Sequence, residues 1–280
     1  MNRSPRSRVR LEICVDRLDS ALAALEGGAD RIEVCGALAC GGVTPSAALI
    51  SACVKLAPLE VMVMIRPHAG SFCYSPADLA VMERDIVAAR QAGAHGVVFG
   101  ALTPDRRIDI GACRRLMAAA GPLTTTFHRA FDMTRDPRAA LDGLIELGVG
   151  RVLSSGQNST AIAGAALLRS LVERSAGRIV VMPGAGVSAV NAVELLDSTG
   201  ASELHASASE PIELAVPSES PELCEPSAKS SSLLPPERKE TMVKPEARQW
   251  DFVFQERRTT VTRVRALRTA IDAHRDVRGF

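Results

Sequence analysis

The chain has 280 residues, 46% of them hydrophobic, which suits one large globular domain such as an α/β barrel. A formal net charge of +1 and an aromatic content of 3% argue against nucleic-acid and acidic-membrane partners, since neither a basic face nor aromatic platforms stand out. No apolar run of about 18 residues is present to cross a bilayer, and residues 1–8, predicted to be flexible, lack the apolar core of a signal peptide, so we expect a cytoplasmic protein.

Residues 11–38 predict a strand, a helix and a second strand. Side chains alternate between two faces along an extended segment, so Glu12 and Cys14 share one face of the first strand and apolar residues occupy the other. Glu33 and Cys35 repeat this pattern in the second strand. Two neighbouring strands therefore each present Glu-x-Cys on the polar face, while the amphipathic helix covers the apolar face.

Glycine-led junctions recur at residues 28–32, 93–97, 148–152 and 200–204. Glycine tolerates the left-handed conformation that ends a helix, and the short connection then leads into a strand. The predicted strands centre on Glu12, Glu33, Val63, Val97, Thr125, Val152, Val180 and Leu204. Apolar spacing marks helices between them, with faces that include Leu18, Leu22 and Leu25; Leu79, Met82 and Ile86; Leu141, Leu144 and Leu147; and Leu168, Leu171 and Val172.

Eight alternations of strand and helix predict a parallel (β/α)8, TIM-barrel-like fold. An open doubly wound sheet is the alternative, but it usually needs a glycine-rich turn after its first strand, and residues 15–18 offer none.

The composition changes within residues 208–250, which we expect to form a disordered or loosely packed insertion in a single barrel domain of residues 9–207 and 251–277. Seven prolines, seven serines and eight glutamates fall in residues 208–249, with little apolar periodicity. A last helix follows, with Val264 and Leu267 on its apolar face. We expect its arginines, including Arg268, to form a solvated face; an anionic docking surface is the alternative.

If the apolar faces of the strands meet the helices, a polar set faces the barrel interior. By phase it contains Glu12, Cys14, Glu33, Cys35, Met62, Met64, Arg66, Thr126, His128, Ser155, Met182, Glu203, His205 and Ser207. Barrel enzymes carry their sites at the carboxyl ends of the strands, which favours Cys14, Cys35, Arg66, His128, His205 and Ser207.

An enzyme site is one hypothesis for this interior. The candidate acids and bases are Glu12, Glu33, His128 and His205, with Asp132 available to orient His128. Equally, an inward carboxylate can simply neutralise Arg31 or Arg66. None of the four lysines lies near a strand's carboxyl end, which argues against a Schiff-base aldolase.

A small anionic or phosphorylated substrate would suit the loops after the last two strands. The turn with Gly184 and Gly186 leaves backbone N–H groups for an anion, Ser188 is placed to cap the next helix, and Arg66 and Ser207 complete the candidate site. The alternative is that these glycines only make a tight turn.

Seven cysteines without a CxxC pair are not typical of a secreted disulfide framework, so we expect reduced thiols. Adjacent strands lie about 4.8 Å apart, and cysteines in phase near one barrel level would bring two sulfurs to one ion. Thiolates select Cu(I), and interior methionines can supplement them, although buried cysteine and methionine are also common core residues.

Long motifs resemble the CutC family, described as copper homeostasis proteins, over residues 10–207. They are LEICVD at 11–16, GGADRIE at 27–33, VMIRP at 63–67, VFGALT at 98–103, TFHRAFD at 126–132 and VMPG at 181–184. The resemblance implies a TIM-barrel-like fold, a cytoplasmic location, a homo-oligomer and a role in copper handling. For members that bind Cu(I), it implies a cysteine pair that falls on Cys14 and Cys35.

Two departures from the family pattern bear on the anion site. Ser209 stands where the family usually has arginine after its last strand, and Ala185 occupies the third position of the glycine-rich turn. The missing arginine weakens the anion hypothesis, whereas Cys14 and Cys35 are intact. Cu(I) binding by the cysteine pair at the barrel mouth is therefore the leading hypothesis, and a barrel enzyme acting on a small anion is the second.

Overall fold

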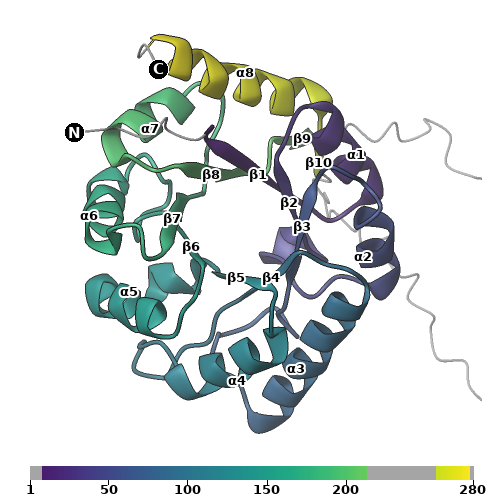
Figure 1. Ribbon diagram of the computed structural model, residues 1–280, viewed down its shortest axis with the longest axis vertical. Helices are drawn as coiled ribbons and strands as arrows, with labels where there is room; N and C mark the ends of the chain where they lie inside the picture. The colour runs from purple at the N-terminus through teal and green to yellow at the C-terminus, as the bar shows by residue number, and fades with distance from the viewer. Residues whose placement is uncertain (1–7, 213–256, 278–280) are drawn as a thin grey trace, which may run out of the picture. The chain divides into compact units, whose positions relative to one another are not determined.

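The computed structural model describes residues 8–212 and 257–277, and its centre is a barrel of eight parallel strands (Figure 1). The strands are β1 (Arg10–Val15), β2 (Arg31–Val34), β3 (Glu60–Met64), β4 (Gly96–Phe99), β5 (Thr124–Phe127), β6 (Arg151–Ser154), β7 (Val180–Pro183) and β8 (Glu203–Ala206). The hydrogen-bonded order is β7-β6-β5-β4-β3-β2-β1-β8, and β7 and β8 lie beside each other, so the sheet curls round on itself. The predicted (β/α)8 fold is confirmed.

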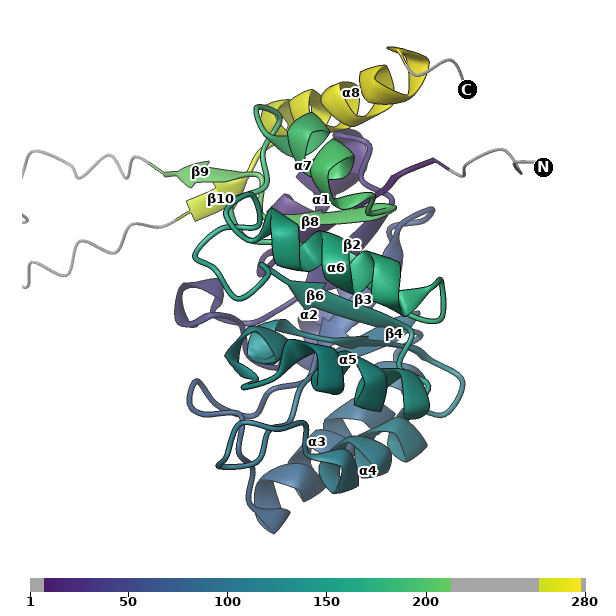
Figure 2. The ribbon, with the colours of Figure 1, turned by 90° about the vertical axis from the view of Figure 1, so that its left-hand side faces the viewer.

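Helices surround the strands in both views (Figures 1 and 2). They are α1 (Leu18–Glu26), α2 (Ala47–Cys53), α3 (Pro76–Gln91), α4 (Ile110–Ala120), α5 (Pro137–Glu146), α6 (Ala165–Ser175), α7 (Ala192–Thr199) and α8 (Val261–Val277), with 3-10 turns η1 (Leu38–Cys40) and η2 (Arg129–Met133). A further pair, β9 (Ser209–Pro211) and β10 (Arg257–Thr259), forms a separate two-stranded sheet. No helix among the described residues is long and apolar enough to span a membrane.

The glycines of the four predicted junctions all adopt left-handed backbone conformations. Their φ angles are +87° at Gly28, +92° at Gly93, +77° at Gly148 and +71° at Gly200. An L side chain is strained in this region, so glycine ends each helix and turns the chain into the next strand.

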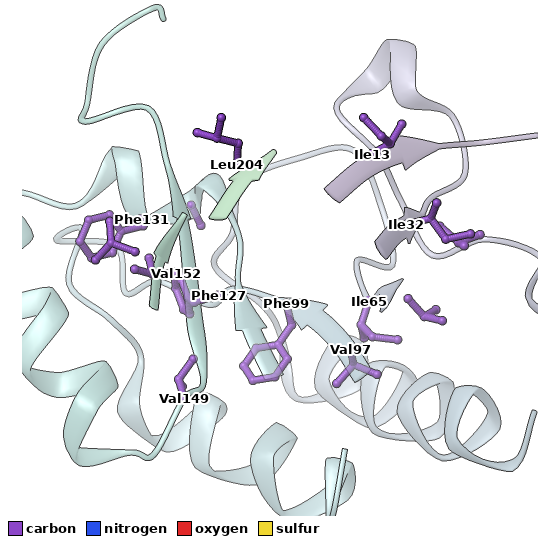
Figure 3. Close-up of a cluster of buried hydrophobic side chains, with 14 of the residues drawn as sticks. Ile13, Ile32, Ile65, Val97, Phe99, Phe127, Phe131, Val149, Val152 and Leu204 are labelled. Atoms are coloured by element: carbon purple, nitrogen blue, oxygen red, sulfur yellow. The ribbon is translucent and has the colours of Figure 1, made fainter. Parts of the chain in front are cut away.

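The main core lies between the strands and the helices, where outward-facing strand residues are buried (Figure 3). Ile13 of β1, Ile32 of β2 and Leu204 of β8 are fully shielded from solvent. The prediction that Leu18 and Leu22 lie on the buried face of α1 is wrong, because these side chains are 40% and 48% exposed. Small residues face inward instead, which lets α1 pack closely on α8, and a Cβ at Gly27 would lie 2.4 Å from Val264.

The last helix packs against α1 and α7. Arg268 is buried rather than solvated, as it bonds to Asp30 at 3.0 Å and to Asp272 at 2.6 Å. The prediction that it belongs to a solvated face is therefore wrong. Most of the predicted insertion, and most of the N-terminal segment predicted to be flexible, lies outside the described residues, but residues 209–211 of the insertion form β9.

Candidate metal centre at the barrel mouth

Three side chains from β1, β2 and β8 meet inside the barrel. The Cys14 sulfur, a Glu33 carboxylate oxygen and a His205 ring nitrogen all lie within 4.8 Å of one another. Cys14 is half-buried, whereas Glu33 and His205 are buried. A thiol, an imidazole and a carboxylate together form a donor set that fits a metal ion.

The register of the strands explains this meeting. Cys14 is the β-ladder partner of Glu33, and Glu12 is the partner of His205. Side chains of register partners on one face lie directly beside each other. Cys14 and Cys35 are therefore diagonal neighbours and not ladder partners, since Cys35 lies two residues further along the chain than Glu33.

Cys35 lies in a second apolar cluster with Met62, Met64 and Val98. The thiol is fully buried, and burial raises its pKa well above the ordinary value. The predicted inward direction of Met62 and Met64 fits this cluster. Met182 also faces the barrel interior as predicted, but its sulfur lies 3.3 Å from the Arg31 guanidinium and is not part of this cluster.

A buried ion-pair network supports the centre from below. Arg31 bonds to both Glu12 and Glu203, and Arg151 bonds to Glu203 at 2.7 Å. Burial alone would raise the pKa of Glu12, but Arg31 and the hydrogen bond from His205 hold that pKa well below its ordinary value. Glu12 is thus an ionised partner of Arg31, which is the charge-neutralising role that the sequence left open.

His205 is held from one side by this network. Its Nδ1 lies 2.8 Å from Glu12 Oε1, and its Nε2 lies 3.7 Å from Glu33 Oε2. Burial lowers the pKa of His205, but hydrogen bonding to Cys14 and Glu12 and the charge of Glu33 raise it well above the ordinary value. The carboxylate at Nδ1 fixes the ring so that Nε2 points at the cluster, as in carboxylate–histidine–metal sites.

Glu33 has one free oxygen. In the described part of the chain its Oε1 is buried without a hydrogen-bond partner, and burial raises the pKa of Glu33 to about 7, with His205 opposing part of that shift. A buried acceptor without a partner is costly, and coordination of a cation would satisfy it. The residues present therefore fit a metal ion.

Arg66 follows β3 and holds two loops together. Its Nη1 donates to the carbonyls of Cys40 at 3.3 Å and Gly42 at 3.0 Å, and its Nη2 donates to Gly70 at 3.0 Å. Its Nε has no partner. Most of the guanidinium predicted to bind an anion is thus used within the protein.

His128 follows β5, but Asp132 does not orient it. His128 Nδ1 accepts a hydrogen bond from the N–H of Ala130, and Nε2 has no partner. Asp132 instead accepts from the hydroxyls of Ser154 at 2.6 Å and Ser155 at 2.9 Å. Asp132 therefore organises the loop after β6, and the predicted Asp132–His128 pair is wrong.

The turn after β7 has a structural role. The Gly184 N–H donates to the Ser154 carbonyl at 2.9 Å, and a Cβ at Gly184 would lie 2.5 Å from Leu153. Gly186 has a φ of +70°, which favours glycine. Ser188 is not the cap of α7, because that helix begins at Ala192 after Asn191.

Ser207 follows β8 and is exposed. Its carbonyl accepts a hydrogen bond from the Thr259 hydroxyl at 3.0 Å. Among the residues that the structure describes, no hydrogen bond or ion pair joins Ser207 to Arg66, Gly184 or Gly186.

Arg31 and Arg151 were missing from the inward set, although both are buried inside the barrel. The signal was in the repeated junctions, because each arginine follows a glycine-led turn and begins a strand. Two basic residues at that position require acidic partners when they point inward, and Glu12 and Glu203 provide them.

The remaining described cysteines differ in exposure. Cys53 and Cys113 are buried in α2 and α4, whereas Cys40, at the end of η1, and Cys73, in a loop, are exposed. All six described cysteines are free thiols.

Sequence comparisons give consistent results. The CutC family model matches residues 9–210. The chain is 50% identical over 198 residues to a CutC family protein of Histophilus somni, covering 71% of this chain and 82% of that protein. It is also 50% identical over 198 residues to the copper homeostasis protein cutC homolog of Homo sapiens, covering 71% of this chain and 72% of that protein.

Structural comparisons agree. A crystal structure of the CutC protein from Streptococcus agalactiae is 32% identical, with a TM-score of 0.69 over 71% of this chain and 98% of that chain. An aldolase matches with a TM-score of 0.54 at 14% identity, covering 72% of this chain and 90% of that chain, and this likeness concerns the fold alone.

Proposed function

The chain belongs to the CutC family of copper homeostasis proteins, and from this premise we propose that it binds Cu(I) in the cytosol through Cys14 and Cys35. The observation that carries the proposal is the gathering of the Cys14 thiol, the His205 imidazole and the Glu33 carboxylate within 4.8 Å. Thiolate and imidazole suit Cu(I) better than they suit the harder cations, and a reducing compartment keeps both thiols available.

The arrangement assigns a distinct role to each group. Cys14 and Cys35 are diagonal neighbours on adjacent parallel strands, and they lie near enough for the Cys14 thiol to contribute to the raised pKa of Cys35. His205 Nε2 is the third donor, oriented by Glu12. Glu33, a hard ligand, serves best as a carboxylate charge partner that offsets the cation, while the proton that His205 gives up is released to solvent.

Anaerobic Cu(I) titration against a chromophoric chelator tests this proposal. The double variant Cys14→Ala/Cys35→Ala should bind at least 100-fold more weakly than the wild type. The matched control Cys53→Ala/Cys113→Ala removes two buried thiols outside the barrel interior and should keep wild-type affinity. Equal affinity in the two double variants would contradict the proposal.

The proposal includes a homo-oligomer, as the family resemblance implies. Light scattering on the purified chain, with and without one equivalent of Cu(I), measures its mass directly. A mass equal to one chain in both samples would contradict this part.

The second candidate function is an enzyme that acts on a small anionic substrate. It is favoured by the raised pKa of Glu33, about 7, beside the His205–Glu12 pair, because an acid and base poised near neutrality suit proton transfer. A thermal-shift screen of phosphorylated and carboxylated metabolites tests it. A ligand that stabilises the wild type but not Glu33→Gln supports the enzyme, and the lack of any such ligand contradicts it.

A further inference from the structure

Arg66, Gly100 and His128 lie side by side at the carboxyl ends of three successive strands. Met64 pairs with Val98, and Val98 pairs with Thr126 in the β3–β4–β5 ladder. Arg66, Gly100 and His128 come two residues further along β3, β4 and β5, so they continue these ladders as neighbours on one face. The backbone hydrogen bond from the His128 N–H to the Phe99 carbonyl, 2.9 Å long, continues the ladder to these residues.

Gly100 makes room for the His128 ring. A Cβ at Gly100 would lie 2.5 Å from both Cε1 and Nδ1 of His128, so only glycine permits the ring to lie over the end of β4. Phe72 packs on both polar groups, with its ring centroid 4.9 Å from the Arg66 guanidinium carbon and 4.9 Å from the His128 ring centroid. The guanidinium and the imidazole are thereby held next to the same aromatic ring.

Both groups have an unused hydrogen-bond donor. Since His128 Nδ1 accepts from the Ala130 N–H, the ring proton is on Nε2, and this N–H has no partner among the described residues. Within residues 8–212 and 257–277, Arg66 Nε also lacks a hydrogen-bond partner, although Arg66 is only 7% exposed and His128 only 4%. Among the described residues, the Tyr74 hydroxyl is a third buried group without a hydrogen bond of ordinary geometry, and it lies beside Arg66, which opposes the rise in its pKa that burial causes.

Two unsatisfied donors next to a positive charge call for an oxygen acceptor with negative charge. Burial, helped by the Arg66 charge, lowers the pKa of His128 to about 3, so the imidazole is a neutral donor while Arg66 supplies the charge. Hydrogen bonds from guanidinium and N–H groups to carboxylate or phosphate oxygens are among the strongest in proteins.

We propose that Arg66 Nε and His128 Nε2 bind an oxyanion, the carboxylate or phosphate group of a small molecule, at the barrel mouth. This site lies at the ends of β3 and β5, away from the glycine turn after β7 that the sequence pointed to. In the second candidate function, on which this role rests, the site would hold the charged group of the substrate. Binding of the oxyanion itself does not require copper.

The test uses the full chain freed of copper by a chelator. With 15N-labelled histidine, sodium phosphate and sodium acetate are titrated separately at constant ionic strength set by chloride. We expect one of them to move the His128 Nε2 resonance in a saturable way at millimolar concentration, which identifies the oxyanion. Absence of a saturable shift with both would overturn the proposal and assign these donors to water.

Two variants test whether His128 binds the anion. His128→Asn keeps an acceptor for the Ala130 N–H but loses the Nε2 donor, whereas His95→Asn makes the same change at an exposed histidine whose Nδ1 accepts from the Val61 N–H. The stabilising anion, measured by thermal shift, should bind His95→Asn like the wild type and His128→Asn at least tenfold more weakly. Equal binding to both variants would also overturn the proposal. A poorly folded His128→Asn would leave the NMR titration of the wild type decisive.

Discussion

Cys14 is the ladder partner of Glu33 and not of Cys35, because β1 and β2 pair with an offset of two residues relative to their Glu-x-Cys motifs. The half-buried Cys14 therefore lies beside the carboxylate and the imidazole, and the fully buried Cys35 lies against methionines. The same Glu-x-Cys motif therefore places the two thiols in different surroundings.

The first prediction concerns this inequality. Cys14→Ala should weaken Cu(I) binding about tenfold more than Cys35→Ala, because Cys14 adjoins His205 and Glu33 whereas Cys35 adjoins apolar side chains. Competition titrations of the two single variants measure the difference. A larger loss in Cys35→Ala would show that the methionine cluster, rather than the Cys14 cluster, holds the metal.

The second prediction is a pH dependence of copper affinity. The pKa of His205 is raised above its ordinary value, so the ring is protonated near neutrality and Cu(I) must displace that proton from Nε2. Below this pKa, affinity should fall by up to about tenfold for each unit of pH lost through this one proton. His205→Asn should bind more weakly and show a slope smaller by about one proton. Identical slopes in the two proteins would exclude His205 as a ligand.

The third prediction concerns stability and Glu33. Its pKa rises from 4.5 in the unfolded chain to about 7 in the folded protein, so the folded state holds the proton more tightly. Stability from this group is therefore present at low pH and is lost as pH rises through that window, by about 3 kcal/mol in total. Between pH 5 and pH 8, urea denaturation should show Glu33→Gln gaining about this amount relative to the wild type. Parallel profiles for the two proteins would contradict the raised pKa.

The fold could be predicted from the sequence because its signals are local. Alternation along β1 and β2 gives the inward phase of Glu12 and Glu33, and the left-handed glycines at helix ends are visible as repeated junctions. The face of α1 could not be predicted, because α8, more than 200 residues away, packs closely enough to require small side chains there.

The site could be predicted only in part. The alternation of side chains along a strand identifies which ones face inward. It does not give the register between neighbouring strands, which depends on how the barrel closes. The Glu12–His205 contact joins residues 193 apart, and no local pattern encodes it. Asp132 was misassigned for the same reason, since its serine partners come from the next strand and loop.

The fourth prediction concerns the network below the centre. Arg31→Met should destabilise the protein by about 3–5 kcal/mol, because it leaves the buried Glu12 and Glu203 carboxylates without this partner. Arg10→Met is the control, since Arg10 forms a partly exposed pair with Glu60 at 2.6 Å and should cost at most about 1 kcal/mol. Chemical denaturation gives both values. A similar small cost for both variants would show that the buried network contributes little.

The fifth prediction compares Gly100, which leaves room for the His128 ring, with Gly111, which has no close neighbour. Gly100→Ala should destabilise by about 1–3 kcal/mol, because the new methyl group would lie 2.5 Å from the His128 ring and must push it aside. Gly111→Ala makes the same change in α4, where the nearest atom is 3.5 Å away, and should stabilise the protein by about 0.5–1 kcal/mol. Thermal unfolding of both variants measures the contrast. If Gly100→Ala were as stable as Gly111→Ala, the His128 ring could move freely, and the placement of its Nε2 beside Arg66 would lose its structural basis.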